Sequence, residues 1–113
     1  MTETFAALAE SSRFRIVELL RSGPRTVNDI TGRLQLSQPL VSQHLRVLKD
    51  AGLVEVERRA QQRIYELRAQ KLRQLHEWLE GYRLIWEERF EQLDELIDEL
   101  AKKEKPDDKR RRK

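Results

Sequence analysis

The stretch that most restricts the fold of this chain is residues 37–53, Ser-Gln-Pro-Leu-Val-Ser-Gln-His-Leu-Arg-Val-Leu-Lys-Asp-Ala-Gly-Leu. Ser37 suits a helix N-cap because its hydroxyl can accept from the free amides of the next turn, and Pro39 falls in the first turn, where a missing N–H costs nothing. Gly52 is a natural helix terminator. Apolar residues recur at steps of four and three, which predicts one buried stripe, Val41, Leu45 and Leu48.

The opposite side of this predicted helix is short and polar. Its Gln, Ser and Arg side chains can hydrogen-bond base edges and phosphates in a major groove. A merely solvated helix face has a similar composition, so the neighbouring segments must decide between the two. His44 falls at the edge of the apolar stripe, where a packed group and a DNA contact are equally compatible. The DNA-contact candidates on this helix are Ser37, Gln38, Pro39, Ser42, Gln43, His44 and Arg46.

The segments before residue 37 predict three more helices. They are a short one at 3–9, one capped by Ser11 or Ser12 that stops at 22–24, and one that follows Thr26 and ends near 35. Thr26 followed by Asp29 resembles a capping box. The turn into residue 37 is only a few residues long, so the third and fourth helices form a helix-turn-helix unit. A tight helical hairpin of any function has the same spacing, which leaves DNA binding open at this point.

Residues 54–67 predict a β-hairpin with a basic tip. Apolar and acidic residues alternate from 54 to 57, a polar connection follows, and 64–67 returns as a second strand. Arginine at the end of a hairpin can simply keep a sheet edge soluble. Directly after a candidate reading helix, the same hairpin is a wing able to grip the DNA backbone or minor groove. The wing candidates are Arg58, Arg59, Gln62 and Arg63.

A long helix is predicted over about 68–101, running through Gly81 with or without a bend. Its apolar residues step by three or four in a near-heptad seam. At 1.5 Å per residue the helix would reach about 50 Å, which is longer than so small a globule can cover. Packing within one chain explains the first half, whereas the rest requires a second copy. The predicted dimer contacts, including two from the first helix, are Phe5, Leu8, Leu79, Tyr82, Trp86, Phe90, Leu93 and Ile97.

The length and the charge distribution of the chain predict one domain over residues 1–101, followed by a disordered basic tail at 102–113. The tail alone sums to +5, against +3 for the whole chain, so the folded part is close to neutral. The tail is either a solvated solubility segment or an arm that contacts phosphates. No apolar run approaches the roughly 20 residues of a membrane span and no secretory signal opens the chain, so we expect a cytoplasmic protein.

Taken together, these elements resemble the winged helix-turn-helix regulators of the ArsR type. The most specific match is the run from Val41 to Val54, which is similar to the family's recognition helix and its exit into the wing. The runs 5–9 and 13–20 are similar to the opening helices. Ser11-Ser12 departs from the Asp-Pro common there, and the wing tip lacks its usual glycine. The resemblance implies a mainly α fold with a small β-hairpin and a long C-terminal dimerisation helix. It also implies a homodimeric repressor that binds an imperfect inverted repeat of double-stranded DNA at a promoter.

Many such regulators sense metals, but the ligand sets are missing here. The chain has no cysteine, and its last helix offers only His76 with Glu80, which a surface i,i+4 pair explains better than a metal site. We therefore expect no metal and no cofactor. No grouping of residues suggests an enzyme. The remaining alternative is a protein-interaction module that uses the same helices and coiled coil without DNA, and substitution of Gln43 or Arg46 would separate the two.

Overall fold

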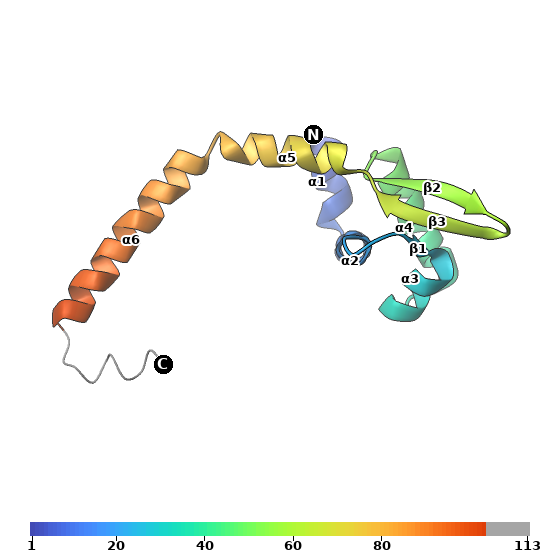
Figure 1. The fold of residues 1–113 in the computed structure, drawn as a ribbon, viewed down its shortest axis with the longest axis horizontal. Helices are drawn as coiled ribbons and strands as arrows, with labels where there is room; N and C mark the ends of the chain where they lie inside the picture. The colour runs from blue at the N-terminus through green and yellow to red at the C-terminus, as the bar shows by residue number, and fades with distance from the viewer. Residues whose placement is uncertain (104–113) are drawn as a thin grey trace. The chain divides into compact units, whose positions relative to one another are not determined.

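The computed structural model describes residues 1–103 and confirms the predicted fold class, a mainly α chain with a small antiparallel sheet (Figure 1). It divides into two compact units, Met1–His76 and the segment from Glu77 onward, which are treated separately below. The expectation of a single domain over residues 1–101 stays a prediction. The elements are α1 (Thr2–Ala9), α2 (Ser11–Leu20), β1 (Arg25–Thr26), α3 (Val27–Leu34), α4 (Gln38–Asp50), β2 (Val54–Arg59), β3 (Gln62–Leu67), α5 (Ala69–Glu80) and α6 (Arg83–Lys103).

Local capping sets the helix boundaries of the first unit. Ser37 caps α4 as predicted, since its hydroxyl accepts from the Leu40 amide at 3.3 Å. Thr26 likewise caps α3 by accepting from the Asp29 amide at 3.1 Å. The cap of α2 is Glu10, whose carboxylate accepts from the Arg13 amide at 2.9 Å, so the predicted serine cap was wrong. A carboxylate satisfies the same free amides and also favours the positive end of the helix dipole.

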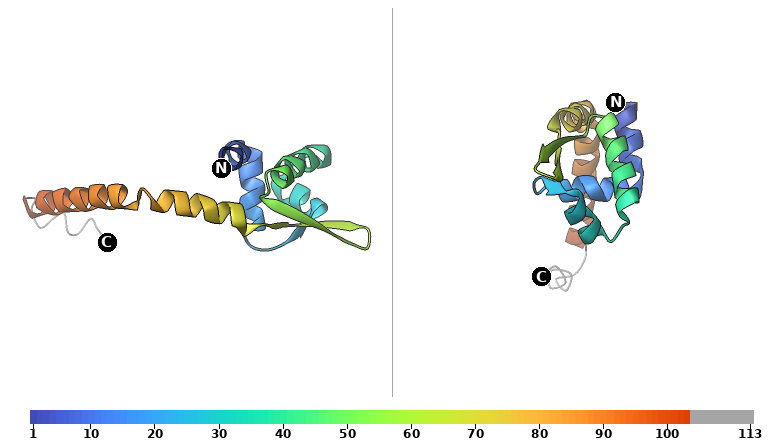
Figure 2. Two further views of the ribbon diagram at one scale, coloured as in Figure 1. Left: turned by 90° about the horizontal axis from the view of Figure 1, so that it is seen from above. Right: turned by 90° about the vertical axis from the view of Figure 1, so that its right-hand side faces the viewer.

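The sheet has three strands in the order β1-β3-β2, all antiparallel. β2 and β3 run side by side as one long hairpin in every view (Figures 1 and 2). The two-residue strand β1 pairs Arg25 with Tyr65 and Thr26 with Ile64, and the sequence did not predict it. Two residues carry no periodicity, so only the pairing with β3 defines this strand. It joins the segment that enters α3 to the wing.

The core of the first unit is built on the predicted stripe of α4. Val41, Leu45 and Leu48 are all fully buried. They pack with apolar residues of the other elements, which include Ile16, Ile30, Leu53 and Val54. Burial of one side of α4 by three well-spaced aliphatic residues fixes its rotation about its own axis. The polar side is therefore held outward.

The predicted helix over 68–101 is interrupted, which corrects the expectation of a single helix. α5 ends at Glu80 and α6 begins at Arg83. The Gly81 amide donates to the Trp78 carbonyl at 3.1 Å and the Tyr82 amide to the Leu79 carbonyl at 2.9 Å, which are the three-residue bonds of a tightening turn. Glycine at this point weakens the α-helical alternative by up to about 1 kcal/mol.

At its other end, α6 runs to Lys103, two residues beyond the predicted boundary. The rest of the predicted tail, residues 104–113, lies outside the described residues. Within residues 1–103, no helix is both long enough and apolar enough to cross a membrane.

Candidate nucleic-acid interface

The outward side of α4 carries the predicted reading residues. Ser37, Gln38, Pro39, Ser42, Gln43 and Arg46 are all exposed. Pro39 lies in the first turn of the helix, as the sequence predicted. Because the buried stripe fixes the rotation of α4, these side chains share one accessible surface that runs from the N-cap to just past the middle of the helix.

Part of this surface forms one wall of an open polar groove of about 410 Å³, called here the α4–wing groove. Three parts of the first unit contribute to it: one flank of α4, the junction of β1 and α3, and the tip and β3 strand of the wing that β2 and β3 form. The lining residues are Thr26, Val27, Asn28, Gln38, Ser42, Arg46, Lys49, Gln61, Gln62, Arg63 and Tyr65.

Five of the predicted DNA-contact residues thus lie together in one groove, namely Gln38, Ser42, Arg46, Gln62 and Arg63. Sequence reasoning missed Asn28 and Lys49. Lys49 follows Ser42 and Arg46 at helical steps of four and three, so the same spacing argument could have found it. Asn28 offered no such signal, since it reaches the groove only through the tertiary packing of α3.

The register of the wing separates its arginines. Arg58 is paired directly with Arg63, so the two side chains stand on the same face as Tyr65, which lines the groove. Arg59 lies on the other face, where its Nε donates to a Glu57 carboxylate oxygen at 3.3 Å. That face also carries Glu55 and Glu66. Arg58 and Arg63 therefore stand on one basic face and Arg59 stands on a back face rich in carboxylates, while Gln62, the strand partner of Arg59 at the tip of the hairpin, still lines the groove.

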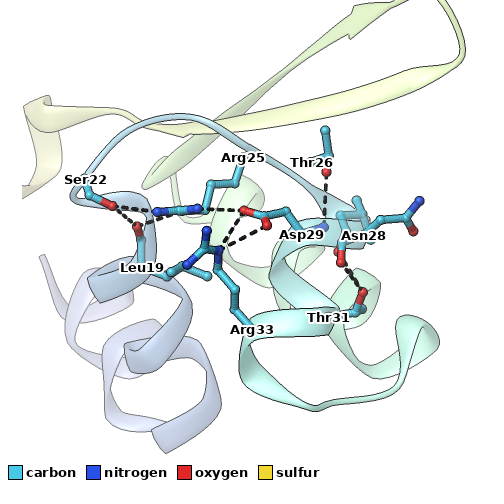
Figure 3. A network of polar contacts seen from close by, with 9 residues as sticks. Leu19, Ser22, Arg25, Thr26, Asn28, Asp29, Thr31 and Arg33 are labelled. Atoms are coloured by element: carbon cyan, nitrogen blue, oxygen red, sulfur yellow. Dashed lines mark hydrogen bonds and ion pairs between the residues drawn. The ribbon is translucent and has the colours of Figure 1, made fainter.

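A polar network holds the entry to α3 beside the groove (Figure 3). The Arg25 guanidinium donates to the Asp29 carboxylate at 2.7 Å and to the Ser22 hydroxyl at 2.9 Å. Arg33 donates to the same carboxylate at 3.1 Å. These contacts, the one from Arg25 first, lower the pKa of Asp29 below its usual value. The network ties the β1 segment to α3 and fixes the groove wall that carries Thr26 and Asn28.

His44 does not join the exposed surface. It is buried, and its Nε2 lies 3.7 Å from a Glu10 carboxylate oxygen at the start of α2. Its Nδ1 has no hydrogen-bond partner among residues 1–103. Of the two alternatives that the sequence left open, the packed one is correct, because position 44 turns toward α2 and not toward the outer face of α4. His44 is therefore removed from the DNA-contact set.

Residues 10–56 match the family model described as "Bacterial regulatory protein, arsR family". The transcriptional repressor SdpR of Bacillus subtilis is 32% identical over 79 residues, an alignment that covers 70% of this chain and 88% of SdpR. The chain belongs to the ArsR family. The HTH-type transcriptional repressor SmtB of Mycobacterium tuberculosis is 45% identical over 65 residues, 58% of this chain and 48% of SmtB.

Among solved structures, an ArsR-family candidate, Mb0332 of Mycobacterium bovis, is similar with a TM-score of 0.61 and 26% identity, covering 80% of this chain and 82% of that one. It is described as a homodimeric winged helix-turn-helix DNA-binding domain. The chain spans about half the length of the curated relative SmtB.

The ArsR-family chain leaves most of its predicted dimer contacts accessible. Phe5 on α1 is exposed, whereas Leu8 packs partly against the core of the first unit. In the second unit Trp86 is half-buried, and the Trp78 and Tyr82 rings meet edge to face with centroids 5.1 Å apart. The other predicted contacts are exposed, namely Leu79, Tyr82, Phe90, Leu93 and Ile97.

Proposed function

We propose that this ArsR-family chain is a sequence-specific DNA-binding transcriptional regulator, a homodimeric repressor that binds an imperfect inverted repeat at a promoter. The single observation that carries the proposal is the α4–wing groove, in which the polar flank of α4 and the basic face of the wing line one surface. An α-helix fits the major groove of B-DNA, and a hairpin beside it reaches the adjoining backbone and minor groove.

The proposal assigns different tasks to the residues of this surface. Gln38, Ser42 and Gln43, near the N-terminus of α4, are the base-edge readers. Arg46 is a further base or near-base contact, and the other three cations, Lys49, Arg58 and Arg63, are the contacts to the phosphate backbone. Within residues 1–103 none of these four cations takes part in an ion pair, so no internal carboxylate has to be displaced before phosphate binds.

A homodimer provides the second reading helix that an inverted repeat requires. Half-sites about one helical turn apart need two copies of α4 at a fixed separation. Support comes from the exposed apolar residues of α6 and from the homodimeric state named for the M. bovis relative. Since DNA is the proposed ligand, we propose that the protein acts in the cytoplasm.

The test is a footprint on the DNA upstream of the protein's own gene, followed by titration of the protected duplex with variants. Gln43→Ala should weaken binding to the protected site by tenfold or more while binding to unrelated duplex stays the same, as expected for a lost bidentate base contact of about 1–3 kcal/mol. Gln70→Ala removes the same side chain at an exposed position on α5 and should leave both affinities unchanged. Equal affinity of the wild-type protein for all duplexes would overturn sequence-specific reading, and absence of DNA binding would favour the protein-interaction module.

We also propose that binding needs no metal. Within residues 1–103, no three side chains of His, Asp or Glu gather in a way that could hold a metal ion. Addition of zinc or of a chelator should leave the affinity for the protected duplex unchanged. A shift of tenfold or more would reassign His76 and Glu80 as part of a metal site formed between two chains.

A further inference from the structure

No carboxylate lines the α4–wing groove within residues 1–103, although the chain contains 20 aspartate and glutamate residues. The charged side chains of the groove are three cations, Arg46, Lys49 and Arg63, which come from α4 and the wing. The third part of the groove, the junction of β1 and α3, adds only the uncharged residues 26–28. This combination suits a phosphodiester strand, because every phosphate of the strand carries a negative charge.

Asn28 is the residue of this junction whose side chain has hydrogen-bonding groups to spare. It is exposed, and within the described part of the chain its carboxamide is engaged in no hydrogen bond. Thr26 differs, since its hydroxyl oxygen already accepts from the Asp29 amide at 3.1 Å and caps α3. A carboxamide N–H can donate to a phosphate oxygen without carrying a charge of its own. Asn28 can therefore add a neutral contact to a surface whose other phosphate contacts are cations.

The residue that follows Asn28 carries a carboxylate, and the structure turns this carboxylate away from the groove. Figure 3 shows the Asp29 side chain directed at Arg25 and Arg33, and the Asn28 side chain directed to the opposite side. The Arg25 side chain, which donates to Asp29 at 2.7 Å, is only 19% exposed. It also donates to the Leu19 carbonyl at the end of α2, at 3.3 Å. The Arg25–Asp29 pair therefore neutralises the nearest carboxylate and fixes the backbone on either side of residues 26–28.

We propose that Asn28 donates to a phosphate of the DNA backbone and that the Arg25–Asp29 pair positions it. The inference rests on the proposed DNA-binding function and adds to it a contact from the third part of the groove. With α4 in the major groove and the wing at the adjoining minor groove, the strand that separates those two grooves passes between α4 and the wing. That strand enters the α4–wing groove, where the junction of β1 and α3 faces it.

The measurable effects of a neutral phosphate donor differ from those of a base reader or of a cation. Asn28→Ala should weaken DNA binding by about tenfold or more, since a hydrogen bond to a charged group is lost. The loss should be equal for the protected and for unrelated duplexes, because phosphates carry no sequence information. The slope of log affinity against log salt should keep its wild-type value, because an uncharged amide releases no counterions. Gln70→Ala, which deletes an amide outside the groove, is the matched control and should change neither quantity.

A duplex with a neutral methylphosphonate in place of one phosphate tests the contact itself. At one phosphate of each half-site, this replacement should weaken the wild-type complex by more than it weakens the Asn28→Ala complex, since the variant has already lost that contact. Asn28→Asp keeps the shape of the side chain, puts a carboxylate in the groove and should bind more weakly than Asn28→Ala. If the effects of Asn28→Ala and of the methylphosphonate are additive at every position of the protected duplex, Asn28 touches no phosphate and the proposal is wrong.

The positioning role of Arg25 is measured separately from its effect on stability. Arg25→Ala leaves the Asp29 carboxylate without this partner beside the groove, so the folded variant should bind DNA more weakly. The double variant Arg25→Ala with Asp29→Asn should bind more tightly than Arg25→Ala alone. If Arg25→Ala lowers only the melting temperature and the folded variant binds DNA like the wild type, the pair does not position Asn28. Absence of DNA binding by the wild-type protein would remove the proposed function itself, whereas a protein that binds DNA equally well after Asn28→Ala overturns only this inference.

Discussion

The two faces of the wing make a quantitative prediction about which arginine holds DNA. Arg63 lines the α4–wing groove, whereas Arg59 lies on the back face with its guanidinium on Glu57. Arg63→Ala should therefore remove one phosphate contact from each subunit, and Arg59→Ala should remove none. The two substitutions delete the same side chain four residues apart, on neighbouring strands of the same hairpin, so Arg59→Ala is the matched control.

The size of the effect follows from counterion release. Each phosphate contact contributes about 0.9 to the slope of log affinity against log salt, so the loss of two contacts in a dimer lowers the slope by about 1.8. When salt rises four-fold, from 50 to 200 mM, the affinity of Arg63→Ala should fall about twelve-fold less than that of the wild-type protein. Fluorescence anisotropy titrations of a labelled duplex at several salt concentrations measure both slopes. Equal changes of slope for Arg59→Ala and Arg63→Ala would refute the assignment of faces.

Three further predictions concern the unit that carries α4. Asp29→Asn should lower the melting temperature at pH 7. Because the folded pKa of Asp29 is depressed, the difference from wild type should shrink as the pH falls below 3.8 and disappear once the pH is below the depressed pKa; a difference that does not shrink with falling pH would refute the ionic role. Gln35 and Ala60 adopt φ of 55° and 54°, so Gln35→Gly and Ala60→Gly should each raise the free energy of unfolding by about 0.5–1 kcal/mol in urea denaturation, and a loss would mean that those side chains contribute contacts of their own. Leu45→Ala, at a fully buried site, should lower the free energy of unfolding by about 2–5 kcal/mol in the same assay, whereas a loss below 1 kcal/mol would contradict its place in the core.

The features that the sequence predicted correctly are those decided by neighbours along the chain. The cap at Ser37, the buried stripe of α4 and the two strands of the wing each depend on residues within one or two turns. Ala60, a non-glycine residue with positive φ, shows where reasoning from neighbouring residues fails. We noted that the wing tip lacks its usual glycine, yet the chain adopts positive φ there with Ala60, because the hairpin register requires it.

The features that the sequence did not predict depend on contacts between distant segments. β1 exists only through its pairing with β3, and Asn28 reaches the groove only because α3 packs beside the wing. To predict that Arg58 and Arg59 lie on opposite faces of the hairpin, and which face carries each, one needs the strand register. A shift of the register by one residue would exchange their faces. Gly81 was noticed, but the regular pattern on both sides of it outweighed its low helix propensity in the prediction of one continuous helix.

For the proposed DNA complex, charge placement accounts for how a nearly neutral body would bind the duplex in one orientation. Residues 1–101 carry no excess of cations, so long-range attraction cannot supply the affinity. Cations of α4 and the wing face the groove instead, while Glu55, Glu57 and Glu66 occupy the back of the same hairpin. A duplex that approached the back face would meet carboxylates, whereas one that approached the groove would meet Arg46, Lys49 and Arg63. The wing therefore contributes to orientation by repulsion on one side as well as by attraction on the other.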